Sequence, residues 1–382
     1  MKIERQAFVR LKQLAQPGIA LILYGPRRVG KTTLIEKWIG ELSEKQVIRF
    51  TGDSAIDRDR LVLNDQRYLK DLLGSATHVF IDEAQRIPNI GLTLKLIVDW
   101  LPDKYVIATG SATFALARQT EEPLTGRKRT LSLYPISYPE LAAWRGTLEA
   151  KIALERWLIW GSYPMAVSID NENERKLWLE ELVNGYLYKD ILEYSGIRHA
   201  GKIVDLLRLL AYQIGGQVSM SELGAQLSMT KETVAHYLDL LVQSFILVQV
   251  RGLSRNLRKE IAKTSRYYFW DTGIRNVLIN NMNGLKLRDD AGMLWENFMV
   301  TERLKRMANL GERKNYYFWR THDQKEIDWV EEAGGMLNGY EFKYQNGGIK
   351  QSVRDTFLAA YPGSVLHVVT KDNFEEQMLN IR

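Results

Sequence analysis

The sequence predicts an α/β protein of several domains, the first of which is built on a parallel sheet. A chain of 382 residues is long enough for two or three domains that each bury a core. Apolar residues make up 45% and charged residues 26%, which fits a globular chain and excludes a disordered or fibrous one. Near the N-terminus, a short apolar run, a glycine-bounded loop and an amphipathic helix follow one another. That succession is typical of the first βα unit of a parallel sheet.

The first strand, loop and helix carry a phosphate-binding motif. GIALILYG predicts a buried strand, and KTTLIEKWIGEL has the period of a helix. Between them, GPRRVGKT matches G-x-x-x-x-G-K-[ST], in which backbone N–H groups surround the β-phosphate. The lysine reaches the β- and γ-phosphates, and the hydroxyl ligates magnesium. We therefore expect ATP and Mg²⁺ to bind at Gly25, Pro26, Arg27, Arg28, Val29, Gly30, Lys31, Thr32 and Thr33.

A second apolar run, in ATHVFIDEAQRI, ends in two carboxylates. Asp82 and Glu83 then lie at the C-terminal end of a strand, where ligands of open α/β sheets bind. Asp82 is expected to hold the magnesium together with Thr32, and Glu83 to orient and deprotonate the attacking water. The pair predicts an ATP hydrolase; an exposed acidic turn is the plainer alternative.

The third predicted strand, in KYVIATGSAT, ends in small polar residues. Ser111, and less favourably Thr109, is placed to contact the γ-phosphate or the water. Arg127 and Arg129 follow in LTGRKRTLSLYP, and Arg127 is the preferred candidate for an arginine that reaches the γ-phosphate of the same or a neighbouring subunit. For either arginine, a solvated surface position is the open alternative.

The order GPRRVGKTTL, FIDEAQ, ATGSAT, LTGR and LYPISYPEL resembles a large family of bacterial and archaeal AAA-type ATPases with a C-terminal domain of unknown function. The resemblance runs along the whole chain. It implies a P-loop AAA-type ATPase core at residues 1–133, a helical lid at 134–200, a winged helix-turn-helix at 201–266 and a restriction-endonuclease-like α/β domain at 267–382.

The middle of the chain has helical periodicity and many aromatic residues. Helical spacing favours core packing over stacking on bases for Trp144, Trp157, Trp160 and Trp178. From residue 201, the pattern of helix, short strand, two helices and a β-wing indicates a winged helix, with Lys231, Thr233 and His236 on its third helix. The continuation of the wing, RGLSRNLRKEIAKTSR, holds six Lys or Arg against one acid and is a candidate phosphate-contacting strip. A lid or interface module is the equal alternative to DNA contact.

THDQKEIDWVEEAGGMLNGYEFKY predicts a β-hairpin in the C-terminal region. Its second strand places Glu341 and Lys343 on one face, and Asp328 on the first strand can point the same way. Two such carboxylates can hold a second Mg²⁺ or Mn²⁺, beside which Lys343 can stabilise charge in phosphodiester hydrolysis. The Asp, Glu-x-Lys pattern resembles the restriction-endonuclease-like superfamily. Glu296, in GMLWENFMVTERL, matches the extra acidic metal ligand that many members carry on a preceding helix.

Composition narrows the function classes. Cysteine is absent, which excludes disulfides and thiolate metal sites. No run approaches the roughly 18 apolar residues of a membrane span, and the N-terminus lacks a signal-peptide core, so we expect a cytoplasmic protein without a membrane partner. A net charge of +6 is mild evidence for a polyanionic partner.

These patterns lead to one main hypothesis and its rivals. The main one is an ATPase that uses its nucleotide state to control a DNA-engaging, metal-dependent nuclease module, with ATP and DNA as partners and homo-oligomerisation left open. The alternative is a regulatory switch ATPase whose winged helix and catalytically inert C-terminal domain are interaction modules. A DNA-binding transcription regulator is weaker, because it would not need Glu83.

Overall fold

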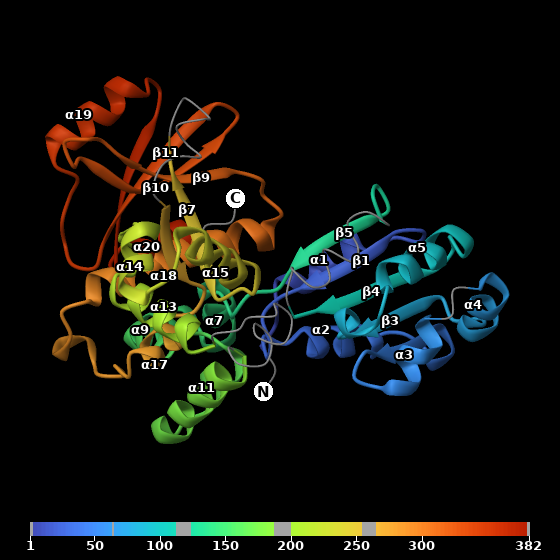
Figure 1. Ribbon diagram of the computed structural model, residues 1–382. Coiled ribbons are helices and arrows are strands. Elements are labelled where there is room, and N and C mark those ends of the chain that lie inside the picture. Colours follow the sequence, from blue (N-terminus) through green and yellow to red (C-terminus); the bar gives the residue numbers. More distant parts are fainter. Residues whose placement is uncertain (1–2, 63–64, 112–123, 187–199, 254–264, 380–382) are drawn as a thin grey trace. The chain divides into compact units, whose positions relative to one another are not determined.

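The structure, a computed structural model, describes residues 3–62, 65–111, 124–186, 200–253 and 265–379 (Figure 1). These residues fall into two compact units divided at residue 136, except that residues 243–245 group with the first unit. We describe each unit by itself. Most of the basic strip predicted after the wing, residues 254–264, lies outside the described residues.

The first unit contains a five-stranded parallel sheet in the order β2-β3-β4-β1-β5. Its strands are β1 (Ala20–Tyr24), β2 (Val47–Thr51), β3 (His78–Asp82), β4 (Tyr105–Gly110) and β5 (Lys128–Ser132). All five residues of β1 are buried, as the continuous apolar runs of a parallel sheet require. The carboxyl ends of β1, β3 and β4 meet at one edge of the sheet, which positions the candidate site.

Five α-helices and two short 3₁₀ helices accompany this sheet among the described residues (Figure 1). The α-helices are α1 (Ala7–Leu14), α2 (Lys31–Ile39), α3 (Ala55–Val62), α4 (Gln66–Leu73) and α5 (Ile90–Trp100). The 3₁₀ helices are η1 (Glu44–Gln46) and η2 (Ala84–Arg86). The predicted strand, loop and helix at the N-terminus are thus β1 and α2, joined by the phosphate loop.

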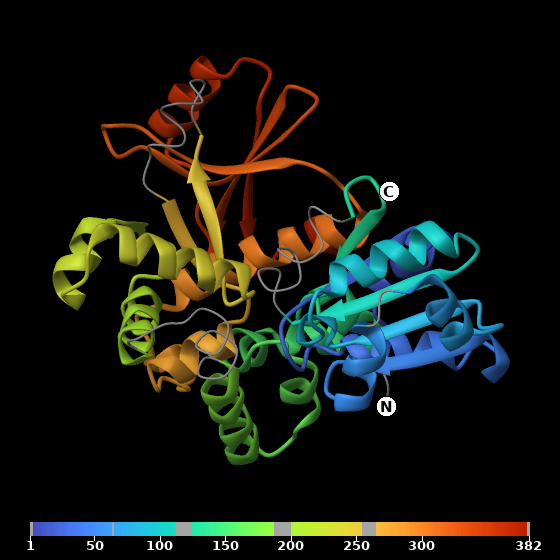
Figure 2. The same cartoon turned by 45° about the vertical axis from the view of Figure 1, so that its right-hand side comes forward.

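The second unit begins with helices and carries further ones between its strands (Figure 2). The described α-helices are α7 (Tyr138–Arg145), α8 (Thr147–Ile152), α9 (Leu154–Trp160), α10 (Pro164–Ser168), α11 (Glu172–Tyr186), α13 (Ala200–Tyr212), α14 (Met220–Leu227), α15 (Lys231–Gln243), α17 (Thr272–Leu278), α18 (Ala291–Leu310), α19 (Gln351–Ala360) and α20 (Phe374–Leu379), with the 3₁₀ helix η4 (Leu285–Leu287). Trp157, Trp160 and Trp178 are buried, so core packing is confirmed for these three, while Trp144 is half-buried.

A seven-stranded mixed sheet, ordered β12-β11-β10-β9-β7-β8-β6, runs through the second unit. Its strands are β6 (Gln217–Val218), β7 (Leu247–Gly252), β8 (Ser265–Phe269), β9 (Asn315–Arg320), β10 (Glu326–Ala333), β11 (Met336–Lys343) and β12 (Val365–Thr370). The elements predicted for 201–266 occur in the predicted order, as α13, β6, α14, α15, β7 and β8. The winged-helix assignment itself stays a prediction.

One sheet spans both sides of the predicted boundary at residue 266. β8 runs across it, and β7 pairs in parallel with β9 through Arg251 and Gly252. The pairing satisfies backbone groups that would otherwise line an open sheet edge, which explains why the two predicted domains share one sheet. α19 packs on this sheet through Phe357, which contacts a core of Trp319, Ile327 and Val330.

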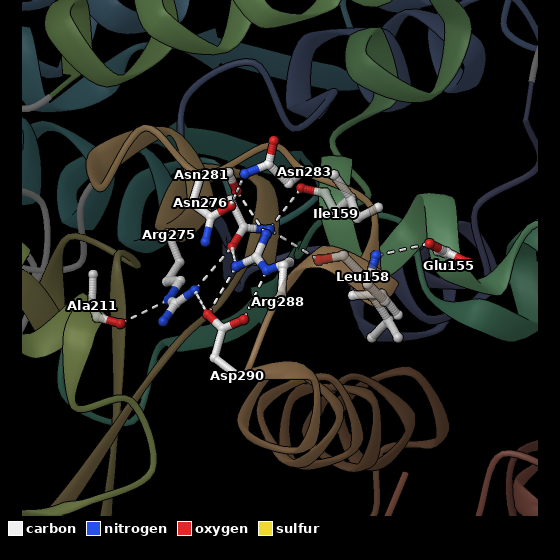
Figure 3. Close-up of polar contacts among 11 residues, drawn as sticks. Glu155, Leu158, Ile159, Ala211, Arg275, Asn276, Asn281, Asn283, Arg288 and Asp290 are labelled. Carbon is white, nitrogen blue, oxygen red and sulfur yellow. Dashed lines mark hydrogen bonds and ion pairs between the residues drawn. The ribbon is translucent and has the colours of Figure 1, made fainter. Parts of the chain in front are cut away.

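A buried polar network lies between α17, α9 and the start of α18 (Figure 3). The Asp290 carboxylate accepts hydrogen bonds from Arg275 and, at 2.7 and 2.8 Å, from Nε and Nη2 of Arg288. Asn276 links the same arginines to α9 by donating to the carbonyls of Leu158 and Ile159 at 3.1 and 2.8 Å. The network therefore ties α17, α9 and the start of α18 together.

None of the helices in the described parts of the chain combines the length and the apolar character needed to span a membrane.

Candidate functional sites

The phosphate loop joins β1 to α2. Gly30 caps α2 with φ +101°, a left-handed conformation that favours glycine, and a Cβ on Gly25 would lie 2.3 Å from the Leu133 carbonyl oxygen. Lys31 is buried, and its Nζ donates to the carbonyls of Gly25 and Pro26 at 2.7 and 3.0 Å. The ammonium group thus lies inside the loop, where a bound nucleotide would place its phosphates.

The predicted magnesium ligands come together at the same edge of the sheet. Thr32 Oγ1 donates to Asp82 Oδ2 at 2.9 Å. The other carboxylate oxygen of Asp82 accepts the Glu83 N–H at 3.1 Å and the Thr109 hydroxyl. Hard oxygen donors of this kind suit Mg²⁺. Thr109, the less favoured of the two residues at the end of the third strand, is therefore the one that positions Asp82 directly.

Glu83 follows β3 in a left-handed conformation, with φ +48°. Its carboxylate is held by a residue that the sequence reasoning missed: Gln85 Nε2 donates to Glu83 Oε2 at 2.7 Å and to Ser111 Oγ at 3.0 Å. Gln85 and Ser111 are both buried. Ser111 is therefore linked to Glu83 through Gln85, and its predicted contact with the γ-phosphate or the water stays a prediction. The sequence signal for Gln85 was a polar residue two positions after the carboxylate.

A cavity of about 410 Å³ opens beside these side chains. Its volume is in the range of small-molecule sites, and charged groups of both signs line it. The lining comprises Arg27, Arg28, Gly30, Lys31, Thr32, Thr33, Asp53, Asp82, Glu83 and Arg86. Arg86 Nη1 pairs with Asp53 Oδ1 at 2.5 Å on the rim. The cavity thus brings the predicted loop cations, the Mg²⁺ ligands and the predicted base to one place.

Arg127 lies elsewhere in the unit. Its carbonyl accepts the N–H of Ala20, at the start of β1, and its Nε pairs with Asp99 at 2.7 Å. The phosphate loop follows the other end of β1, roughly 16 Å away at about 3.3 Å per strand residue. Arg127 therefore does not reach the γ-phosphate bound to its own chain, which corrects that half of the prediction. A role toward a neighbouring subunit stays a prediction.

A second cluster lies in the other unit, where Glu296 of α18, Asp328 of β10 and Glu341 of β11 come together. Burial, with the negative charges of Glu296 and Glu341, raises the pKa of Asp328 well above its ordinary value. Burial also raises the pKa of Glu296. Asp328 Oδ2 accepts the Phe342 N–H at 2.9 Å, and Lys343 Nζ pairs with Glu341 Oε1 at 2.7 Å. The sequence pattern thus predicted correctly that these side chains are neighbours.

The sequence did not foresee Arg266, which lies at the centre of this cluster. Its Nη1 is 3.4 Å from Glu296 Oε1 and 3.8 Å from Asp328 Oδ1, and its Nη2 is 2.6 Å from Glu326 Oε2. Its side chain is only 4% exposed. Arg266 was counted in the basic strip, but it faces carboxylates inside the protein and is not available to a nucleic-acid phosphate. Arg251, at the other end of the strip, is exposed.

The donor atoms of the second cluster suit a divalent cation in kind. They are carboxylate oxygens, and Glu341 Oε2 is buried with no hydrogen-bond partner in the described structure. Within the described ranges, however, no group of three or more His, Asp or Glu side chains is arranged to hold a metal ion. Arg266 supplies the positive charge instead. A second metal therefore stays a prediction.

The exposed face of α15 is not strongly basic. Lys231 and His236 are exposed and Thr233 is half-buried, but Glu232 and Asp239 are exposed on the same helix. This mixture of charges gives no particular support to phosphate contact by the helix.

Residues 18–142 match the model of the AAA domain. The first unit contains a P-loop AAA-type domain. Residues 151–285 match a domain of unknown function (DUF8612), and residues 291–378 match another (DUF4143). The match to the AAA domain supports ATP binding and ATPase activity, while the other two matches indicate no activity.

The chain is also similar to proteins of other organisms along most of its length. An uncharacterized protein of Mycobacterium tuberculosis is 27% identical over 364 residues, which cover 94% of this chain and 78% of the relative. Uncharacterized proteins of Methanocaldococcus jannaschii and Haemophilus influenzae are 22% and 21% identical, covering 83% and 99% of this chain and 79% and 93% of the relatives. The similarity spans both units.

Proposed function

We propose that this protein hydrolyses ATP at the phosphate loop and uses its nucleotide state to control the second unit as a DNA-engaging, nuclease-like module. The observation that supports ATP hydrolysis is the contact between Thr32 and Asp82, which lies beside Glu83 in the same cavity. A protein that only bound nucleotide would not need a carboxylate held next to the magnesium ligands.

At the phosphate loop, the backbone N–H groups and Lys31 would bind the β- and γ-phosphates. Thr32 and Asp82 would hold Mg²⁺, which neutralises phosphate charge when bound. Glu83 would accept the proton of the attacking water, and Gln85 would keep the Glu83 carboxylate in a defined orientation until nucleotide arrives. Ser111, through Gln85, would link the end of β4 to that carboxylate.

The nuclease-like half rests on where the acidic side chains lie in the fold. α18, β10 and β11 occur in the order of the helix and hairpin that the restriction-endonuclease-like resemblance implies, and α19 and β12 follow them, with β12 parallel to β11. Burial and the negative charges of Glu296 and Glu341 raise the pKa of Asp328, and this cost supports a functional reason for gathering the carboxylates. Glu296, Asp328 and Glu341 would be the ligands of a metal whose bound water attacks a phosphodiester, with Lys343 beside them.

The alternative is a regulatory switch in which the second unit is an interaction module that cuts nothing. Arg266 favours this alternative, because its guanidinium already pairs with Glu296, Glu326 and Asp328. The mixed charge of the α15 face favours it too.

Cleavage of supercoiled plasmid distinguishes the two functions. The purified protein is incubated with Mg²⁺ or Mn²⁺, with and without ATP, alongside Lys31→Ala, Glu341→Ala and Glu332→Ala. Glu332 is a carboxylate of the same hairpin outside the cluster, so its variant is the matched control. We expect nicking that depends on Glu341, responds to ATP through Lys31 and survives Glu332→Ala. ATP turnover without any nicking would leave the regulatory switch, and unchanged turnover in Lys31→Ala would refute the ATPase assignment.

A further inference from the structure

We propose that Arg266 is a built-in cation that holds the second cluster closed, so that the cluster admits a divalent ion only when the Arg266 side chain withdraws. The inference rests on the proposed nuclease-like function for the role of the cluster, and it adds a gate to that function. Its basis is the position of one guanidinium among carboxylates that come from two different elements.

The carboxylates converge on Arg266 from separate parts of the fold. Glu296 comes from α18, whereas Glu326 and Asp328 come from β10. Arg266 itself lies on β8, whose ladders with β6 and β7 fix its backbone, and its guanidinium lies 4.6 Å from the centre of the Phe318 ring. A cation at this point therefore holds α18 and β10 together, as a bound metal ion would.

The cluster contains one buried hydrogen-bond donor and one buried acceptor that have no partner among the described residues. Arg266 engages the carboxylates through Nη1 and Nη2, while its Nε is buried with no partner among the described residues. Glu341 is only 8% exposed, and its Oε2 is also buried with no partner within the same ranges. A buried donor and a buried acceptor left unsatisfied cost free energy. The open acceptor on Glu341 is what a divalent ion would satisfy and Arg266 does not.

Arginine and a divalent ion exclude each other here. Arg266 stays charged at every pH that the protein survives, because guanidinium does not lose its proton in proteins. Two cations a few ångströms apart in a buried site repel strongly. Loss of the Arg266 proton therefore cannot open the cluster, whereas a movement of the Arg266 side chain can.

Metal binding tests the gate without relying on activity. Mn²⁺ is titrated into the nucleotide-free full chain, and free Mn²⁺ is followed by electron paramagnetic resonance. The proteins are the wild type, Arg266→Gln and Arg266→Lys, each with and without Glu341→Gln, which identifies binding at this cluster. We expect Arg266→Gln to bind one Mn²⁺ at least about tenfold more tightly than the wild type. Glu341→Gln should abolish that gain, and Arg266→Lys, which keeps the charge, should behave as the wild type.

Two results would overturn the proposal, and they differ in whether the proposed nuclease-like function also fails. If the wild type binds Glu341-dependent Mn²⁺ as tightly as Arg266→Gln, Arg266 is no gate, but the nuclease-like function survives. If neither protein binds Mn²⁺ at this cluster, both the gate and the metal-dependent function fail. Should Arg266→Gln not fold, Arg266→Met, which keeps most of the buried volume, replaces it in the same titration.

Discussion

Asp290 is the side chain whose loss should destabilise the second unit most clearly. Its carboxylate is the shared partner of Arg275 and Arg288, whose side chains are 1% and 0% exposed (Figure 3). Replacing Asp290 with Asn keeps the size of the side chain and removes its charge. Two buried guanidinium groups then face a neutral amide, which can accept at one oxygen only.

The pKa of Asp290 gives the scale of the effect. Burial opposes ionisation, but hydrogen bonds and charges from Arg288 and Arg275 outweigh it and lower the pKa from 3.8 to about 2. That change of the pKa corresponds to roughly 2 kcal/mol of unfolding free energy at neutral pH. Removing one partner of a buried ion pair typically costs about 3–5 kcal/mol, so we expect Asp290→Asn to cost about 2–5 kcal/mol.

The pH dependence has a defined sign. Because the folded pKa lies below the unfolded one, the contribution of Asp290 is fully present above about pH 4 and is lost as the pH falls toward 2. The difference between wild type and Asp290→Asn should therefore shrink over that window.

Urea unfolding followed by tryptophan fluorescence measures the effect. All of the ten tryptophans except Trp38 and Trp100 lie in the second unit, so the signal reports mainly on that unit. Asp289→Asn, at the exposed neighbouring carboxylate, is the matched control and should change the unfolding free energy by less than about 0.5 kcal/mol. If Asp290→Asn unfolds within that same margin of the wild type, the network contributes no net stability and the reasoning is wrong.

Three further predictions concern the phosphate-loop site. Glu83→Gln should bind ATP normally and lower the turnover rate by about 10²–10⁴-fold, as measured by nucleotide binding and phosphate release; normal turnover would exclude Glu83 as the base. Gln85→Ala should lower kcat while KM for ATP stays near the wild-type value, because Gln85 orients Glu83 and does not line the cavity; a rise in KM alone would count against this role. Gly52→Ala should lower turnover at least about tenfold, since its Cβ would lie 2.2 Å from the Glu83 carbonyl oxygen and must displace it, and an unchanged rate would show that the turn adapts.

The N-terminal site could be predicted in most of its parts because they are local. The phosphate loop needs only a strand, a glycine-bounded turn and a helix within one stretch of chain, and G-x-x-x-x-G-K-[ST] specifies all three. Asp82 and Glu83 follow an apolar run, so the direction of the strand was enough to predict that both lie at its carboxyl end. For the same reason, the hairpin register correctly made Asp328 and Glu341 neighbours.

Contacts between distant parts of the chain were beyond the reach of local patterns. Gln85 bonds to Ser111 across 26 positions, and Arg266 reaches Glu326 across 60. The strip that contains Arg266 was predicted to contact phosphate because six of its residues are Lys or Arg. The pairing of β8 within the sheet turns Arg266 toward buried carboxylates instead. Likewise, the parallel pairing of β5 with β1 places Arg127 beside the start of β1, whereas the phosphate loop follows the end of β1.

By itself, then, the sequence determined the phosphate loop, its two carboxylates and the acidic hairpin, because each depends on a periodicity or motif read along one short segment. Only the tertiary structure decided which cation meets the second cluster and that β7 joins β9 in one sheet. Such partners depend on how whole elements pack to bury their apolar faces and satisfy their backbone groups, and no local spacing encodes that.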